Sequence, residues 1–277
     1  MANLRKTIIF GGTGLIGSYL QQGIKLGHQD GDITKLSSVE KVFKKYHPNL
    51  VINLAAKINL ADCEADPQGA FAINVLGAYH IALVCRKYKA RLVYLSTGAV
   101  FDGSKTSGFK EANQPHPLNV YGQTKYLAEQ ITAGLVSNSL VIRTGWVFGG
   151  GPAKDNKFYG LAIRKILSGK VLQANYDETG SPVYAKDLAA KVMQLAWSRR
   201  RLIHIVNSGR ASRYGIAQEL AKILHKKAVI KKTHSKDFQN EFIRAKSEFL
   251  ASKYVHLRPW QQALREYLKE EWRGVKA

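Results

Sequence analysis

The sequence has little cysteine, no long apolar run and no leading apolar segment. Only two of its 277 residues are cysteines, Cys63 and Cys85, and their separation does not match the spacing of a zinc site. Two cysteines without a disulfide framework fit a reducing cytoplasm. No apolar stretch approaches the ~20 residues of a membrane helix, and residues 1–6 lead straight into a strand without a signal-peptide apolar region. We therefore expect a cytoplasmic protein with neither a membrane span nor a metal site.

Acidic residues are scarce relative to basic ones. There are 20 of the former and 42 of the latter, which gives a formal net charge of +22. A field of this sign attracts nucleotides, phosphorylated substrates, nucleic acids and anionic membranes alike. The charge is not confined to a tail, however, and no signature of a nucleic-acid-binding module accompanies it. We therefore expect solvated helix faces and an anionic small-molecule substrate, and no nucleic-acid partner.

Short apolar runs alternate with helical segments through the first half of the chain. The runs at 7–10, 50–54, 92–95 and 140–142 are typical of buried strands. This alternation predicts an α/β fold, a Rossmann-like doubly wound parallel sheet with helices on both faces. In such sheets ligands bind in the crevice at the carboxyl ends of the strands.

A glycine-rich turn follows the first of these strands. Gly12, Gly14 and Gly17 match G-x-G-x-x-G and stand between a strand and a helix, as a dinucleotide-binding turn requires. The glycines permit a tight turn and let a pyrophosphate approach the amino terminus of the helix. The residues predicted to contact the cofactor here are Gly11, Thr13, Gly14, Leu15, Ile16 and Gly17.

The next segment is too short for a complete Rossmann unit. Residues 18–31 must contain the rest of a helix and a second strand, so we expect that strand to be truncated or missing, with 24–26 as its candidate remnant. An acidic residue after this strand usually binds the adenosine ribose of NAD. Here Asp30 is the only acidic residue, whereas Lys25 and His28 could bind a 2′-phosphate. The sequence therefore favours NADPH as cofactor, with NADH also allowed.

A tyrosine and a lysine four residues apart suggest proton-transfer chemistry. Tyr121 and Lys125 would project from one face of a helix that begins near Asn119. A neighbouring ammonium favours the phenolate and lowers the pKa of the phenol, which would make Tyr121 a proton donor for a ketone becoming an alcohol. The hydroxyl of Thr97, at the end of a strand, could hold the same carbonyl oxygen. The alternative is a half-buried tyrosine with a solvent-exposed lysine.

Two further features are candidates for the cofactor site. Leu54, Ala55 and Ala56 end the strand at 50–54, where small side chains leave room for a flat cofactor ring or permit tight helix packing. Asn74 lies on the largely apolar face of a helix expected over 70–87. It is either a satisfied core amide or part of the cofactor site, and we include it in that site. No Ser-His-Asp set, paired catalytic carboxylates or metal cluster suggests another chemistry.

The carboxyl-terminal half has shorter elements and suits a small cap. We expect residues 1–147 to form the dinucleotide-binding domain and residues 148–277 mainly the substrate-binding cap, with the segment near 183–207 returning to the first domain. Sugar specificity would be set by basic residues of this cap, for each of which exposure to solvent is the alternative. These residues are Lys154, Lys157, Lys165, Arg210 and Arg213.

Motifs along nearly the whole chain resemble one known family. They lie at 11–17, 32–34, 48–56, 96–103, 117–125, 143–148, 180–189 and 257–264. Together they resemble the dTDP-4-dehydrorhamnose reductases, which are extended short-chain dehydrogenases/reductases that reduce the 4-keto group of nucleotide-linked sugars. The resemblance implies an NAD(P)H-dependent oxidoreductase of deoxysugar biosynthesis with a nucleotide-diphosphate sugar as substrate, and it allows a homodimer.

The resemblance also implies roles for individual residues. Thr97, Tyr121 and Lys125 would form the catalytic set, and Lys125 would also bind the ribose. Asp32 and Ile33 would contact adenine. The nicotinamide side would be bordered by Ala55 and Ala56, and Trp146 would face the sugar pocket, next to Thr97.

The chain departs from the family pattern at several positions. Gly98 stands where the family commonly has an aspartate, Gly145 where it has a serine, and Arg213 near the place of a usual tryptophan. These departures bear on the identity of the sugar. Two alternative functions stay open: a non-catalytic, NADP-binding regulatory subunit such as the family supplies for a methionine adenosyltransferase, and a nucleotide-sugar epimerase or dehydratase.

Overall fold

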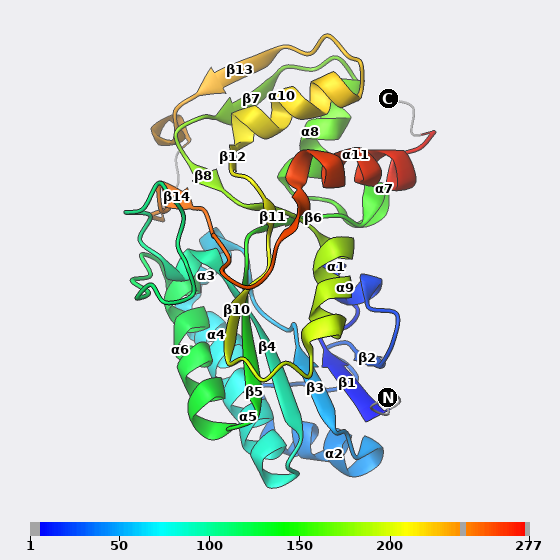
Figure 1. The fold of residues 1–277 in the computed structure, drawn as a ribbon, viewed down its shortest axis with the longest axis vertical. Helices are drawn as coiled ribbons and strands as arrows, with labels where there is room; N and C mark the ends of the chain where they lie inside the picture. Colours follow the sequence, from blue (N-terminus) through cyan, green and yellow to red (C-terminus); the bar gives the residue numbers. More distant parts are fainter. Residues whose placement is uncertain (1–5, 239–241, 275–277) are drawn as a thin grey trace.

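The computed structural model describes residues 6–238 and 242–274, and a six-stranded parallel sheet forms its larger part (Figure 1). The strands are arranged in the order β10-β5-β4-β3-β1-β2. Their bounds are β1 (Thr7–Phe10), β2 (Ile24–Leu26), β3 (Leu50–Asn53), β4 (Arg91–Thr97), β5 (Ser139–Thr144) and β10 (Leu202–His204). The expected α/β, Rossmann-like class is confirmed.

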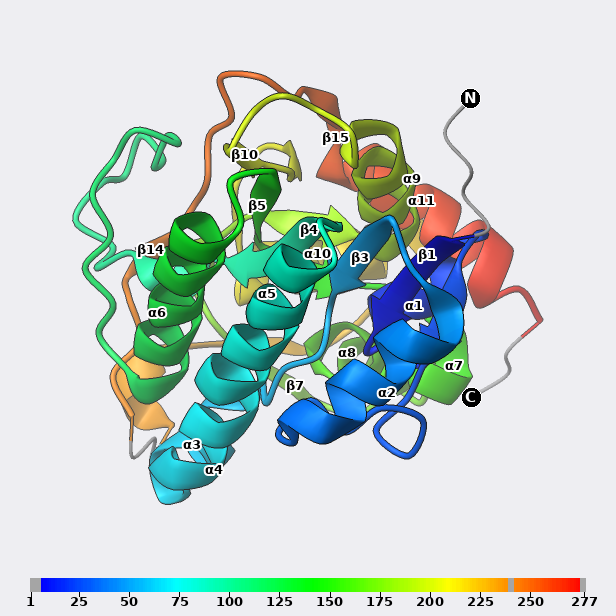
Figure 2. The same cartoon turned by 90° about the horizontal axis from the view of Figure 1, so that it is seen from below.

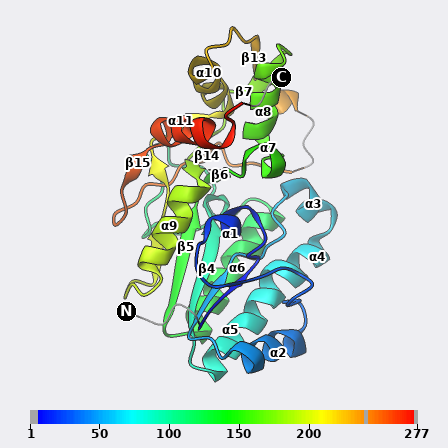
Figure 3. The ribbon, with the colours of Figure 1, turned by 90° about the vertical axis from the view of Figure 1, so that its right-hand side faces the viewer.

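Helices cover both faces of this sheet, which is why its strands are apolar at almost every position. On one face lie α2 (Leu36–Tyr46), α5 (Gly77–Lys87) and α6 (Val120–Leu135), and on the other α1 (Leu15–Tyr19) and α9 (Ala185–Leu195). Ile8 packs in one core cluster with Phe43 of α2, whereas its neighbour Ile9 packs in another with Leu188 of α9. Figures 2 and 3 show α5 and α9 on opposite sides of the strands.

The strand order reverses at β1. The chain passes from β1 to β2 at one edge and then to β3 on the other side of β1. A crevice forms at the carboxyl ends of β1 and β3, where such sheets bind their ligands. The second strand has only three residues and α1 only five, so the predicted truncation of this region is confirmed.

The helix predicted over 70–87 is longer and contains a π-helical turn. After α3 (Leu60–Ala65) come α4 (Pro67–Phe71), the π-helix η2 (Ala72–Leu76) and α5. By length and composition the combined segment Pro67–Lys87 could span a membrane, although we expected no such apolar stretch. In the fold, 56% of its most apolar window is buried. It packs beside α2 and α6, as core helices do.

Among the described residues, the smaller lobe contains short strands and four α-helices. The helices are α7 (Gly151–Lys154), α8 (Phe158–Leu167), α10 (Arg213–Ile223) and α11 (Trp260–Glu271). The paired strands are β7 (Leu172–Asn175) with β13 (Ile230–Thr233), β6 (Trp146–Phe148) with β9 (Pro182–Tyr184), β11 (Asn207–Ser208) with β15 (Leu257–Pro259), and β8 (Thr179–Gly180) with β12 (Ala211–Ser212) and β14 (Ser247–Glu248). Its separate core includes Tyr159, Ile163, Leu220 and Leu264.

The chain crosses between the two lobes more than once. After β6 and the first helices of the small lobe it returns through α9, which packs on α1, to β10 at the edge of the central sheet. The two-residue strands of the small lobe were not expected from the sequence, because a period-two pattern needs four or more residues to be visible. One of them, β14, contributes Glu248 to a cavity at the carboxyl end of the sheet.

Candidate active site

A cavity of about 830 Å³ lies between the carboxyl end of the central sheet and the small lobe. It is lined by the predicted cofactor residues Gly11, Thr13, Gly14, Leu15, Ile16, Gly17, Asp32, Ile33, Leu54, Ala55 and Ala56. The predicted catalytic and substrate residues Thr97, Tyr121, Lys125 and Trp146 line the same cavity. The fold therefore brings together residues that lie up to 135 positions apart in the chain (from Gly11 to Trp146).

The glycine turn is packed so tightly that larger residues would not fit. Gly11 has a φ of +72°, and a Cβ there would lie 2.7 Å from the nitrogen of Ala55. A Cβ on Gly17 would lie 2.3 Å from the carbonyl oxygen of Gly12. Gly14, the N-cap residue of α1, provides no side-chain cap, so the first N–H groups of the helix can bind an anion. The turn fits the pyrophosphate of a dinucleotide such as NADPH.

The adenosine end of the cavity corrects one expectation about cofactor choice. Lys25 does not line the cavity, because its Nζ donates to the carbonyl oxygen of Ser18 at 3.2 Å. His28 does line it, with Nδ1 4.0 Å from Oδ1 of Asp32. The hydroxyl of Thr34 donates to the same Asp32 carboxylate and lowers its pKa. Of the two basic side chains expected near a 2′-phosphate, only His28 lines the cavity.

Asn74 does not line the cavity, so the structure does not support its inclusion among cofactor contacts. It is buried in the π-helix η2, where its Oδ1 accepts from the nitrogen of Lys57 at 2.8 Å. Its Nδ2 donates to the carbonyl oxygen of Lys57 and to the hydroxyl of Thr124, both at 3.0 Å. Every polar group of this amide is therefore used to hold the loop after β3 against α6.

The helix that carries Tyr121 and Lys125 begins where the sequence predicted. Asn119 is its N-cap residue, with Oδ1 accepting from the nitrogen of Gly122 at 2.8 Å. Glu64 of α3 supplies a second cap by accepting from the nitrogen of Val120, also at 2.8 Å. These caps fix the first turn of α6, and with it the position of Tyr121 at the cavity wall.

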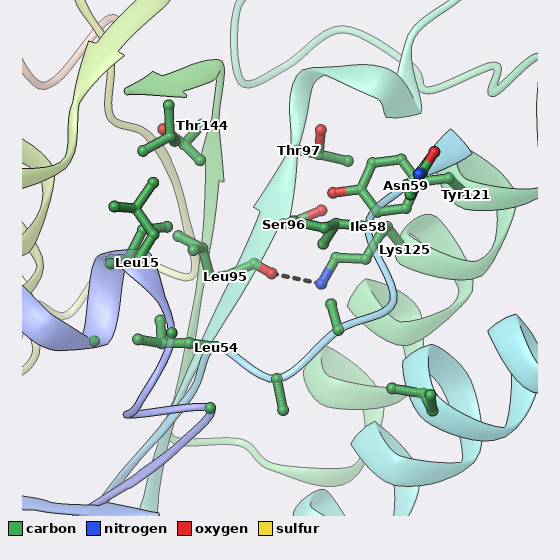
Figure 4. A pocket seen from close by; sticks show the side chains of 18 of the residues that line it. Leu15, Leu54, Ile58, Asn59, Leu95, Ser96, Thr97, Tyr121, Lys125 and Thr144 are labelled. Atoms are coloured by element: carbon green, nitrogen blue, oxygen red, sulfur yellow. Dashed lines mark hydrogen bonds between the residues drawn. The ribbon is translucent and has the colours of Figure 1, made fainter. Parts of the chain in front are cut away.

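Thr97 and Tyr121 present their hydroxyl groups to the same part of the cavity (Figure 4). The hydroxyl oxygen of Thr97 accepts from the nitrogen of Ala99 at 3.1 Å, which leaves its hydrogen free to donate. Burial raises the pKa of Tyr121, and a hydrogen bond with Thr97 opposes that rise. Tyr121 therefore keeps its proton at neutral pH.

Lys125 lies below this pair, and the pKa of Tyr121 is raised overall rather than lowered, contrary to expectation. The Nζ of Lys125 donates to the carbonyl oxygen of Leu95 at 2.7 Å (Figure 4). It also lies 4.2 Å from the ring centroid of Tyr94. Burial lowers the pKa of Lys125 to about 7, although the carboxylate of Glu129 opposes the shift. The four-residue spacing of the two side chains was predicted correctly from the sequence, but the extent to which burial desolvates both groups was not.

The small lobe adds aromatic and charged side chains at the far end of the cavity. The indole Nε1 of Trp146 donates to Oε2 of Glu248 at 2.8 Å. The guanidinium of Arg213 lies 5.0 Å from the ring centroids of both Trp146 and Phe158. Burial lowers the pKa of Arg213, and the charge of Arg244 lowers it further. The guanidinium groups of Arg213 and Arg244 therefore repel each other here, and an anionic ligand would offset this repulsion.

Only part of this end was expected from the sequence. Of the five basic residues proposed, Lys157 and Arg213 line the cavity, whereas Lys154, Lys165 and Arg210 do not. Arg244 and Glu248 line it but were not singled out, because no local pattern distinguishes them from other charged residues. Their place in the cavity follows from the pairing of β14 with β8.

Comparison with known proteins places the chain among sugar-nucleotide enzymes. The family model described as the RmlD substrate binding domain matches residues 5–272. The chain is 30% identical over 280 residues to the spore coat polysaccharide biosynthesis protein SpsK of Bacillus subtilis, covering 96% of this chain and 98% of that protein. It is 32% identical over 228 residues to a dTDP-4-dehydrorhamnose reductase of Mycobacterium tuberculosis, covering 77% and 73% of the two chains.

Solved structures agree with this placement. A dTDP-4-dehydrorhamnose reductase of Bacillus anthracis in complex with NADP superposes with a TM-score of 0.90 at 26% identity, covering 96% of this chain and 99% of that one. A UDP-glucose 4-epimerase of Thermus thermophilus, at 18% identity and a TM-score of 0.79, shares the fold. The resemblance drawn from the motifs is thus confirmed, and the chain belongs to the RmlD substrate binding domain family.

Proposed function

We propose that this protein reduces the 4-keto group of a nucleotide-linked 6-deoxyhexose with NADPH as cofactor. The observation that carries the proposal is that one cavity contains both the glycine turn and the hydroxyl groups of Thr97 and Tyr121. The named relatives that reduce dTDP-linked keto-sugars support the same reaction class. Residues 1–147 would mainly hold the dinucleotide and 148–277 mainly the sugar, with 183–207 returning to the sheet.

Each side chain of the catalytic set has a distinct task. NADPH, when bound, supplies a hydride to the carbonyl carbon. The Tyr121 hydroxyl donates its proton to the carbonyl oxygen, and the hydroxyl of Thr97 donates a hydrogen bond that orients this oxygen. The ammonium form of Lys125 stabilises the phenolate that Tyr121 becomes and binds the ribose. Asp32 and Ile33 contact adenine at the other end of the cavity.

A simple assay tests this function. Purified protein is mixed with NADPH and a panel of dTDP- and UDP-linked 4-keto-6-deoxyhexoses, and net oxidation of the cofactor is followed by absorbance. We expect stoichiometric oxidation and an alcohol product with at least one substrate. Conversion without net consumption of NADPH would indicate an epimerase or dehydratase. If the protein co-purified with a stoichiometric amount of a partner enzyme and converted none of the keto-sugars, a regulatory subunit would be indicated instead.

The cations of the small lobe are suited to the diphosphate of the substrate. Lys157, Arg213 and Arg244 all line the cavity, and a diphosphate diester carries two negative charges that would offset their mutual repulsion. Replacing Arg213 with methionine should raise the dissociation constant of dTDP by about 10- to 100-fold, the loss expected for one charge-assisted contact. Calorimetric titration measures it. Arg210→Met is the matched control, because Arg210 donates to the carbonyl oxygen of Thr106 outside the cavity.

The preference between cofactors should be modest and should depend on His28. An extra phosphate at the end of β2 would gain one partly exposed charge-assisted contact, so we expect NADPH to bind about ten-fold more tightly than NADH. The preference should shrink as salt rises. Dissociation constants of both cofactors measured at two ionic strengths test this. His28→Ala should abolish the difference and Lys25→Ala should preserve it, whereas equal affinities in the wild type would contradict the prediction.

We also propose that the protein is a cytoplasmic homodimer. The cysteines, Cys63 and Cys85, are both free and buried, which suits a reducing compartment. Exposed apolar side chains, among them Phe71, Tyr79 and Leu127, lie on the helices formed by residues 67–87 and by α6, which pack side by side.

Sedimentation velocity tests the homodimer. We expect the wild type to sediment as a dimer and the double variant Tyr79→Glu, Leu127→Lys as a monomer, because buried charges would oppose association. Val229→Lys changes an apolar and even more exposed side chain in the small lobe, and it should leave the dimer intact. A monomeric wild type at micromolar concentration would rule the dimer out.

A further inference from the structure

Glu248 is a carboxylate in an otherwise cationic part of the cavity. It belongs to β14, which pairs in parallel with β8 in the register Glu248 to Gly180. Among the described residues that line the cavity the only other acidic one is Asp32, which lies with the adenosine-binding elements. Neither the catalytic roles nor the diphosphate contact gives Glu248 a task. A nearly buried carboxylate beside an anionic substrate must be offset by a specific donor.

One oxygen of this carboxylate is already engaged. The Trp146 indole donates to Oε2 at 2.8 Å, and Gly180 leaves room for that indole, since a Cβ there would lie 2.4 Å from its Cε2 atom. Within the described residues, Oε1 of Glu248 accepts no hydrogen bond. Glu248 is 9% exposed and lines the cavity, so this second oxygen can accept from a ligand there.

Glu248 also lies close to the reacting centre. Burial raises the pKa of Tyr121, and the negative charge of Glu248 adds to that rise, so the two groups interact electrostatically. The main chain agrees, because a Cβ on Gly98 would lie 3.0 Å from the carbonyl oxygen of Glu248. Position 98, directly after Thr97, is where the family commonly has an aspartate. In this chain the main chain of Glu248 passes next to that position.

The chemistry of the group limits what it can bind. An ionised carboxylate offers only acceptors, so its partner must be a donor such as a hydroxyl. In a 4-keto-hexose the carbonyl carbon has two neighbours in the ring. C5 carries the C6 group and the ring oxygen, so C3 is the adjacent carbon that carries a hydroxyl. When Tyr121 and Thr97 hold the oxygen on C4, the hydroxyl on C3 is the sugar donor adjacent to that oxygen, in the cavity that Glu248 also lines.

We propose that Glu248 is a specificity-determining residue that accepts a hydrogen bond from the C3 hydroxyl of the sugar. The enzyme would then prefer nucleotide-linked 4-keto-hexoses that retain this hydroxyl over their 3-deoxy counterparts. The inference rests on the proposed reduction at C4. A site that hydrogen-bonds a substrate hydroxyl rejects an analogue without it, because the buried acceptor is left unpaired.

The test compares two substrates in two variants. For the wild type we expect kcat/KM to be about 10- to 100-fold higher for a dTDP-4-keto-6-deoxyhexose than for its 3-deoxy counterpart. Glu248→Gln retains the shape and an acceptor for Trp146 but loses the charge. In Glu248→Gln the ratio of the two kcat/KM values should fall below about three-fold. This fall should come only from a lower kcat/KM for the substrate that carries the C3 hydroxyl. A wild type without preference, or a variant that slows both substrates equally, would overturn the proposal.

A matched control separates the contact from the charge. Glu178 is also buried and also interacts with the charge of Arg213, but it pairs with Asn175 and does not line the cavity. Glu178→Gln should therefore leave the substrate ratio unchanged. If the wild type reduces no keto-sugar, the reaction class fails, and calorimetry with unreactive dTDP-6-deoxyglucose and its 3-deoxy form still tests Glu248. Equal affinities of the wild type for these two would overturn the contact itself.

Discussion

Tyr121→Phe is expected to lower kcat by about 10³-fold or more while the dissociation constant of NADPH changes by less than about two-fold. The proton of the Tyr121 hydroxyl is the one delivered to the carbonyl oxygen, and general acid catalysis typically contributes about 10²- to 10⁴-fold. The substitution removes one oxygen and keeps the ring that forms part of the cavity wall. Single-turnover kinetics and fluorescence titration with NADPH measure the two quantities.

Two controls accompany this variant. Tyr126→Phe removes a hydroxyl from the same helix, where it accepts from Gln114 at 3.2 Å outside the cavity, and should leave kcat unchanged. Thr97→Val should reduce kcat less than Tyr121→Phe, because it removes an orienting hydrogen bond and no transferred proton. A Tyr121→Phe variant that retained most of the wild-type rate would show that the proton comes from another group.

Glu129→Gln, which breaks a buried ion pair, is expected to lower the free energy of unfolding by about 3–5 kcal/mol. Glu129 accepts from Nε and Nη2 of Arg143 at 2.9 and 2.6 Å, and the two side chains are 5% and 4% exposed. Removing one partner leaves the other charge buried and uncompensated. For a chain of this size the melting temperature should fall by roughly 10 °C. Urea unfolding measures the free energy directly.

An exposed salt bridge serves as the control for this loss of stability. Lys186 and Glu270 lie 2.6 Å apart, but each is 45% exposed. Glu270→Gln should therefore cost less than about 1 kcal/mol. The double variant Glu129→Leu, Arg143→Met should recover much of the stability that Glu129→Gln loses, since no buried charge remains. Equal losses in the free energy of unfolding for Glu129→Gln and Glu270→Gln would show that burial does not make the Glu129–Arg143 pair special.

The Glu129 substitution should also change the pH dependence of catalysis. The ammonium of Lys125 has a pKa of about 7, depressed by burial and supported by Glu129. As pH rises through this value Lys125 loses the charge that stabilises the phenolate, so kcat/KM should fall, and in Glu129→Gln the fall should begin at lower pH. The pKa of Lys125 in the folded protein lies below the ordinary lysine value of 10.5, so between these two values the unfolded chain binds more protons. Lys125 therefore makes the stability rise with pH across that window.

Features that depend only on neighbours in the chain could be predicted from the amino-acid sequence. The glycine turn between β1 and α1, the four-residue spacing of Tyr121 and Lys125 and the position of Thr97 at a strand end are local patterns. The rule that parallel strands place their carboxyl ends at one edge was enough to bring these residues into one cavity. The family likewise follows from motifs that can be recognised without coordinates.

Which charged and polar side chains reach the cavity depends on the three-dimensional fold and could not be predicted from the sequence. Lys25 and His28 are equally plausible in the sequence, but Lys25 turns to Ser18. Asn74 proved to hold Lys57 rather than line the site, and Glu248 arrives through a two-residue strand. The pKa of Tyr121 rises where spacing alone predicted a fall. Burial and side-chain direction depend on contacts between distant segments, and these contacts leave no periodic signal in the sequence.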